Sequence, residues 1–159
     1  MKEFKSFGAF ALHLERLAAT SGEVKHHILD KAGEEVQKTA QGMIGDYQGA
    51  VGQFPAWEEL ADSTKAERSR LGFSENDPGF RTGEMQRSIK HTVSGEQMAV
   101  GSNDQHIVWF DLGTPNQPPR PIFGPAALHS MDRVKTIIGA TAFAWLAGSG
   151  WRKLRLKSF

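Results

Sequence analysis

The chain has 159 residues, with 19 lysines and arginines against 18 acidic residues, and no cysteine. This length fits a single domain with a core of its own. The net charge of +1 gives no general reason to expect a nucleic-acid or membrane partner. The lack of cysteine excludes disulfides, thiolate zinc sites and cysteine nucleophiles. The first apolar stretch, FGAFALHLERLAA, contains His13, Glu15 and Arg16, so it fits neither a signal peptide nor a membrane span, and we expect a soluble cytosolic protein.

Apolar residues at helical spacing predict two helices in residues 1–50. The first runs from about Ser6 to Ala19 and ends where the residues Thr20 to Gly22 break the pattern. The second runs from Val24 to Tyr47 and has an apolar stripe too narrow for burial on all sides. Gly33, Gly42 and Gly45 lie along it and Gly49 lies just beyond it, so its C-terminal third is expected to be frayed or to owe its order to packing against other parts of the protein.

Residues 51–80 have an irregular pattern. Trp57, Leu60 and Thr64 fit a short helix after Pro55. The loop Phe73 to Gly79 is rich in turn-forming residues and offers little apolar surface, so we expect it to be exposed and mobile.

Residues 81–159 predict a small sheet and further helices. The segment RTGEMQRSIK predicts a short helix with Thr82 as its N-cap, and KHTVSGEQMAVGS predicts a β-hairpin around the turn Ser94 to Glu96. The run HIVWFDLG fits either a third strand or a helical turn. A last helix is predicted from Pro125, at its first position, up to Gly148.

The tail KLRLKS alternates basic and apolar residues, which is a strand pattern. The whole chain therefore predicts an α+β fold, in which a small, mostly antiparallel sheet packs with long N-terminal helices and a C-terminal helix. We expect residues 1–159 to form one domain, made of the ranges 1–50, 51–80 and 81–159.

The sequence offers little support for catalysis. His26 and His27 are adjacent, so they point about 100° apart on a helix, and no zinc-binding spacing occurs. Glu58, Glu59 and the acidic residues that follow them fit a solvated helix face better than a catalytic pair. Nucleophile-elbow, P-loop and dinucleotide-binding motifs do not occur. We expect no enzymatic activity, no metal and no cofactor.

The C-terminal segment WRKLRLKSF has two interpretations. Its cations, with Trp151 and Phe159 beside them, could follow a DNA backbone by charge neutralisation and stacking. The same residues could instead protect an edge strand from aggregation, and we weight this interpretation above the first. The candidate DNA-facing residues are Arg152, Lys153, Arg155 and Lys157.

The proline-rich segment GTPNQPPRPIFGPAA, from Gly113 to Ala127, is the candidate interaction surface. Proline fixes φ and removes a donor, so the segment is expected to span a fixed distance in extended form. Arg120 is flanked by prolines and is therefore expected outside the core, where its guanidinium could dock on a carboxylate of a neighbouring subunit. The candidate interaction residues are Pro118, Pro119, Arg120, Pro121 and Phe123.

Five segments in a fixed order carry a resemblance to a known family. They are WEEL with Thr64 and Lys65, RTGEMQRSI, the VGS that ends at Ser102, FDLGT and PPRPIFGPAA. Together they resemble the bacteriophage virion-morphogenesis and tail-completion proteins, across roughly Trp57 to Ala127. Asp111 stands where a glutamate is frequent in that family.

The resemblance implies a structural protein of the virion neck, where a tail is completed or joined to a filled head. Such a protein acts as a homo-oligomeric ring around the DNA channel, is assembled in the host cytoplasm and contacts neighbouring connector proteins and the tail tube protein. A nucleic-acid-binding module that uses the basic tail is the alternative function. A membrane partner is not expected.

Overall fold

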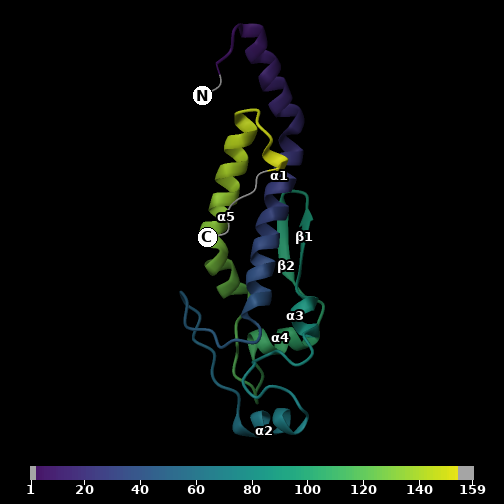
Figure 1. The fold of residues 1–159 in the computed structure, drawn as a ribbon, viewed down its shortest axis with the longest axis vertical. Helices are drawn as coiled ribbons and strands as arrows, with labels where there is room; N and C mark the ends of the chain where they lie inside the picture. Colours follow the sequence, from purple (N-terminus) through teal and green to yellow (C-terminus); the bar gives the residue numbers. More distant parts are fainter. Residues whose placement is uncertain (1–2, 154–159) are drawn as a thin grey trace.

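The computed structural model describes residues 3–153 and has an elongated shape built along one long helix (Figure 1). This helix, α1, spans Phe7–Met43. It begins at Ser6, whose hydroxyl accepts a hydrogen bond from the Ala9 N–H, as an N-cap does. The predicted break at Thr20 to Gly22 is wrong, because the helix continues through it. The Thr20 and Ser21 hydroxyls bond back to carbonyls of the preceding turn instead of ending the helix.

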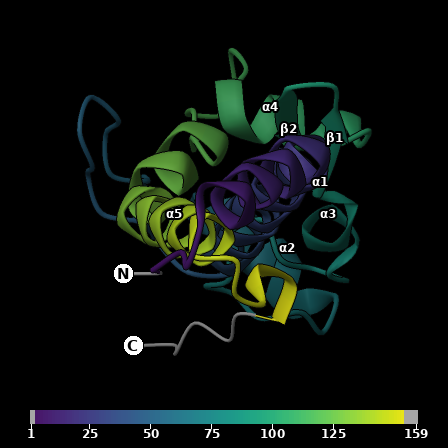
Figure 2. The same cartoon turned by 90° about the horizontal axis from the view of Figure 1, so that it is seen from above.

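Two elements cover α1 from different sides (Figure 2). The helix α5, Phe123–Leu146, lies antiparallel to it, with Ser130 near Thr39 at one end and Trp145 near Thr20 at the other. The hairpin of β1, Lys90–Ser94, and β2, Gln97–Gly101, packs on another side of α1. The α+β class predicted from the sequence is confirmed.

The hairpin has the predicted place and turn. Its strands are antiparallel, with Ser94 opposite Gln97, so Gly95 and Glu96 form a two-residue turn. Gly95 has a φ of +59°, a conformation that glycine adopts without steric cost.

Three short helices surround the end of the molecule where α1 ends. They are α2, Asp62–Arg70, α3, Glu84–Ser88, and α4, Gln105–Leu112, and a 3₁₀ helix, η1, follows α5 at Trp151–Lys153. The run that fitted a strand or a helical turn is thus a helix. The predicted helix after Pro55 begins later than expected, at Asp62, and Trp57 precedes it. The cap position of α3 is Gly83 rather than the predicted Thr82.

The last long helix also differs slightly from the prediction. It begins at Phe123, so Pro125 is its third residue rather than its first. A proline is tolerated there, since the first turn of a helix has N–H groups without helical partners.

The main core lies at the end of the molecule that the short helices surround. Its largest fully buried side chains include Ile89, Ile107 and Ile122. The last turns of α1 also enter this core, through Val36, Ala40 and Met43, so the glycine-containing end of α1 owes its order to packing, as expected. A second, smaller core of Val24, Ala144 and Trp151 lies further along α1.

The loop from Phe73 to Gly79 is held more firmly than its composition indicates. Pro78 is fully buried, and its carbonyl accepts a 2.9 Å hydrogen bond from the Gly45 N–H at the end of α1. The buried Arg68 donates to the carbonyls of Ser74 and Phe80, at 2.6 and 2.5 Å. The expectation of little apolar anchoring was wrong for Pro78, although Ser74, Glu75 and Asn76 are exposed.

Candidate assembly surface

The proline-rich segment folds back on the protein instead of extending away from it. Thr114 and Gln117 exchange two backbone hydrogen bonds across a tight turn, and the Arg120 N–H donates to the Phe110 carbonyl at 2.8 Å. Gly113 has a φ of +79°, and a Cβ there would lie 2.8 Å from the backbone nitrogen of Pro119. Glycine is therefore required where the chain leaves α4. The expectation of an extended spacer is wrong for this turn.

Arg120 was predicted outside the core, and this prediction is wrong. The residue is only 3% exposed. Its guanidinium donates two hydrogen bonds to the Glu58 carbonyl, at 2.9 and 3.1 Å, and one to the Glu59 carbonyl at 3.1 Å. It also lies 5.7 Å from the centre of the Phe110 ring. Burial lowers the pKa of Arg120 from its usual value. Arg120 thus braces its own subunit through its Nε and Nη2 donors.

The other candidate residues of this segment differ in exposure. Pro121 is buried, Pro118 and Phe123 are partly buried, and Pro119 is exposed. The Pro121 carbonyl accepts a hydrogen bond from the Trp57 indole N–H at 3.0 Å. Of the predicted interaction residues, Pro119 is the one whose side chain is largely open to a partner.

All five segments that carry the resemblance meet at this end of the molecule. The Trp57 and Phe110 rings pack edge to face at 5.2 Å, and a carboxylate oxygen of Asp111 accepts hydrogen bonds from the Ile122 and Phe123 N–H groups. Ile89, from RTGEMQRSI, is fully buried beside them. We call Trp57, Ile89, Phe110, Asp111, Arg120 and Ile122 the motif cluster.

Two serines connect the remaining segment, VGS, to the motif cluster. The Ser88 and Ser102 hydroxyls lie 2.6 Å apart and join the end of α3 to the end of β2. Sequence reasoning missed the role of Asp111, whose carboxylate sits at the positive N-terminus of α5 and satisfies two of its free N–H groups. The motif cluster therefore fixes the fold, and its members are mostly interior residues.

The candidate DNA-facing residues are only partly described. Arg152 forms an ion pair with Glu23 and lies 4.7 Å from the Trp151 ring centre. Trp151 is buried against α1 and packs on His27 at 5.3 Å, so it is not available to stack on a base. Lys153 ends the 3₁₀ helix rather than starting a strand. Arg155, Lys157 and most of the predicted strand lie outside the described residues.

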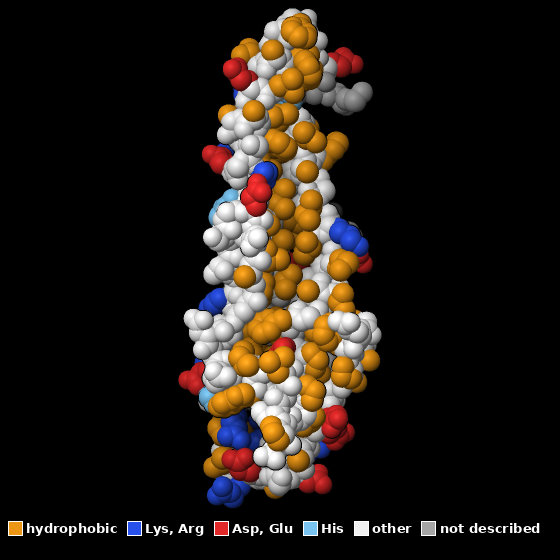
Figure 3. Space-filling view, turned by 180° about the vertical axis from the view of Figure 1, so that it is seen from behind, with side chains coloured by type: hydrophobic (Ala, Val, Ile, Leu, Met, Phe, Trp, Pro, Cys, Tyr) orange, Lys and Arg blue, Asp and Glu red, His pale blue; other side chains and the backbone are white. Residues whose placement is uncertain are grey.

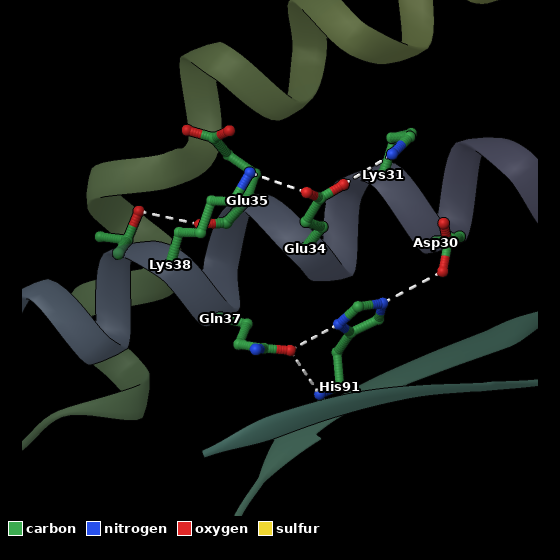
Figure 4. A network of polar contacts seen from close by, with 8 residues as sticks. Asp30, Lys31, Glu34, Glu35, Gln37, Lys38 and His91 are labelled. Carbon is green, nitrogen blue, oxygen red and sulfur yellow. Dashed lines mark hydrogen bonds and ion pairs between the residues drawn. The ribbon is translucent and has the colours of Figure 1, made fainter. Parts of the chain in front are cut away.

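A polar network ties the hairpin to α1 (Figure 4). The His91 ring lies 2.6 Å from the Gln37 side-chain oxygen and 3.1 Å from an Asp30 carboxylate oxygen, one contact at each ring nitrogen. On the same helix, Glu34 accepts hydrogen bonds from Lys31 and Lys38, which lower its pKa to about 2. Because both nitrogens of His91 are occupied within the chain, this network is a brace between β1 and α1.

A cleft of about 420 Å³ opens beside α3 and α4. Its walls carry Arg81, Glu84, His106 and Trp109. Asp104 caps α4 and has a lowered pKa, because the His106 backbone N–H and then the His106 ring donate to it. Within residues 3–153, no group of three histidine, aspartate or glutamate side chains is arranged to hold a metal ion.

Large apolar side chains remain uncovered along α1 and α5. Figure 3 shows hydrophobic side chains gathered along the middle of one face, over these two helices. One group surrounds the N-terminal end of α1, which extends beyond the end of α5 (Figure 1). We call it the overhang surface, and it consists of Phe7, Phe10, Leu14 and Leu17 of α1 with Phe143 and Leu146 of α5.

A second group that is only partly covered lies on α5, on the side turned away from α1. We call it the outer stripe, and it consists of Leu128, Met131, Ile138 and Ala142. The first three are between 38% and 45% exposed. The residues of α5 that are buried, such as Ala126, Ile137 and Ala144, point toward the opposite side of the helix. Sequence periodicity could not separate these two faces, since both are apolar.

Comparisons with known proteins give no further identification. No family model, curated protein or solved structure matches this chain. Among the described residues, no helix is both long enough and apolar enough to cross a membrane.

Proposed function

We propose that this protein is a structural subunit of a tailed bacteriophage virion, a tail-completion or neck protein that acts in a homo-oligomeric ring at the head–tail junction. The observation that carries the proposal is the extent of apolar surface left uncovered on the overhang surface and the outer stripe. Exposed contiguous patches of this kind mark interaction sites in soluble proteins. An assembly subunit needs such surfaces, whereas an isolated soluble domain does not.

The motif cluster supports the assignment to this family. The five segments of the resemblance are spread over residues 57–127, and they contribute to one core and its border. Motifs that pack against one another are expected to occur together in the members of a family, because each motif depends on the others for its position in the fold. The resemblance supplies the location in the virion, and the partners that follow from it are further copies of the chain, connector proteins and the tail tube protein.

The proposal assigns no catalytic step to the protein. Nucleic-acid binding through the basic tail remains the alternative, but the engagement of Arg152 and the burial of Trp151 favour a structural role for the part of that tail that is described.

Complementation tests the proposal directly. Extracts from a phage in which the gene for this chain is disrupted should accumulate filled heads and separate tails, and the purified protein should restore joined particles. Imaging of the restored particles should show a ring of this chain between head and tail. Joined, infective particles that form without the chain would overturn the proposal, and so would its absence from purified virions.

The binding of the full chain to duplex DNA is measured in addition to complementation. Under the proposal, the full chain binds duplex DNA weakly, and no more strongly than a control protein of similar charge. Tight binding with a steep dependence on salt concentration would favour the nucleic-acid alternative instead.

A further inference from the structure

We propose that the overhang surface of one copy of this chain packs on the outer stripe of a second copy. This inference rests on the proposed function, because it names the contact that would join neighbouring subunits of the ring. It starts from the two uncovered surfaces, which lie on different parts of the same chain.

The overhang surface continues an interface that already exists within the subunit. Phe7, Phe10, Leu14 and Leu17 follow one another at spacings of three and four residues, and the same spacing leads through Ser21 to the buried Val24. From Val24 onward this face of α1 is covered by its own chain, with Ala144 and Trp151 packed on Val24. Toward the N-terminus α5 reaches as far as His13, whose Nε2 lies 2.9 Å from the Leu146 carbonyl, so the same apolar face is left without its covering helix from there on, at Phe7 and Phe10 (Figure 1).

The residues of the outer stripe repeat at the same helical spacing as those of the overhang surface. Leu128, Met131, Lys135, Ile138 and Ala142 follow one another at spacings of three, four, three and four residues. Two helices with this period can interlock their side chains along a shallow crossing angle. Lys135 is the charged member of the series and pairs with Asp132 at 3.3 Å. Its four-carbon stem can lie along an apolar neighbour while the ammonium group stays in water.

The size of the overhang surface suits a protein partner. Phe7, Phe10 and Phe143 are 85%, 39% and 75% exposed. Taking about 200 Å² for one phenylalanine side chain, these three rings leave on the order of 400 Å² in water. A stable interface buries roughly 800 Å² on each partner, so the rings alone supply about half of it. A hollow of about 360 Å³ beside Phe10, Leu14 and Phe143 could receive a side chain of the neighbour.

A second copy is the occupant that accounts for both surfaces at once. A contact between two different surfaces of identical chains leaves one of each free on every pair, so further copies add in the same direction. When the rotation between neighbours closes, the result is a ring in which each overhang surface and each outer stripe is covered. A contact of the overhang surface with itself would cover the first surface and leave the outer stripe in water.

Complementary variants test the contact in the full-length chain. The overhang variant carries Phe7→Glu and Leu14→Glu, and the outer-stripe variant carries Met131→Glu and Ile138→Glu. The controls are Leu12→Glu, whose side chain is 56% exposed on another side of α1, and Thr136→Glu, on another side of α5. Circular dichroism and thermal melting establish that each variant is folded before its association is measured by sedimentation velocity over a range of concentrations.

The wild-type chain and both controls should self-associate alike. Each variant alone should show an apparent dissociation constant at least about tenfold weaker, because charge replaces apolar anchors at the contact. An equal mixture of the two variants should form dimers and nothing larger, since each variant supplies the intact surface that the other lacks.

Several results would overturn the inference. A mixture that stays monomeric would show that the overhang surface and the outer stripe do not pack on each other. An outer-stripe variant that still dimerises alone would point to an overhang surface that packs on itself. Variants that form the same oligomer as the wild-type chain would show that other residues make the contact, and the proposed ring would stand. A wild-type chain that remains monomeric throughout, and is single-copy in imaged particles, would overturn both the contact and the ring.

Discussion

The replacement of Arg120 by alanine offers the sharpest test of how this fold is held together. The guanidinium is buried and donates three hydrogen bonds to two carbonyls in the segment before α2. Alanine would remove all three, leave those carbonyls without their donors and open space beside Phe110. A hydrogen bond to a charged group contributes about 1.5–3 kcal/mol. Glu58 and Glu59 lie at the surface, where water can replace part of the loss.

We therefore expect Arg120→Ala to lower the free energy of unfolding by about 3 kcal/mol, which is less than the roughly 4.5 kcal/mol that three such bonds would contribute at the least, because water replaces part of the loss. For a protein of this size, that corresponds to a melting temperature lower by roughly 6–12 °C. Arg120→Lys should lose about 1–2 kcal/mol, because an ammonium group keeps the charge but cannot serve both carbonyls with the planar fork of arginine.

Urea unfolding followed by circular dichroism measures these differences, with Arg81→Ala as the matched control. Arg81 pairs with Glu67 at 3.1 Å, and both side chains are more than 40% exposed. Arg81→Ala should lower the free energy of unfolding by less than about 1 kcal/mol. An Arg120→Ala protein as stable as the Arg81→Ala protein would show that the buried contacts of Arg120 do not stabilise the fold, and the reasoning would be refuted.

Three further predictions concern α1 and the loop beside α2. Gly22→Ala should raise the free energy of unfolding by about 0.5–1 kcal/mol, since a Cβ there meets open space in mid-helix. Gly33→Ala should lower the free energy of unfolding, since its Cβ would lie 2.8 Å from the His91 ring. Urea unfolding in which both substitutions change the stability in the same direction would contradict this. Glu34 has a folded pKa of about 2, below its unfolded value, so its contribution should be present above about pH 4.5 and lost as the pH falls toward 2. Because its side chain is 34% exposed, that contribution should be below about 1 kcal/mol, and Glu34→Gln should flatten this part of the pH profile by that amount; an unchanged profile would count against it. Arg68→Ala should speed amide exchange at Gly45, whose N–H bonds to the Pro78 carbonyl of the loop that Arg68 holds, and unchanged protection at Gly45 would argue against the anchoring role.

The elements with a strong local signal were predictable from the sequence. The hairpin was found because alternation and a glycine turn are properties of adjacent residues. The continuous α1 was missed, because Thr20, Ser21 and Gly22 each disfavour a helix interior, whereas α5 holds this part of α1 through contacts such as the hydrogen bond from the Trp145 indole to Thr20. Local propensity carries no information about a helix 125 residues away.

The candidate residues of the proline-rich segment failed for a related reason. Arginine between prolines is usually exposed, so composition alone places Arg120 at the surface. Its burial depends on two carbonyls more than 60 residues earlier in the chain, which no spacing rule connects to it. The indole of Trp57 and the carboxylate of Asp111 hold the same segment from two other directions.

The division between the two ends of the molecule has a consequence for assembly. The segments that carry the resemblance are used in the motif cluster, where substitutions act first on stability. The overhang surface and the outer stripe contribute little to the interior, since all their larger side chains except Leu17 are already between 38% and 85% exposed in the single chain. Charged substitutions there should leave the melting temperature within a few degrees of the wild type and still abolish joining. If Arg120→Ala and the overhang variant were instead to lose stability and joining in the same proportion, folding and assembly would depend on one set of contacts, and the separation argued from burial would be wrong.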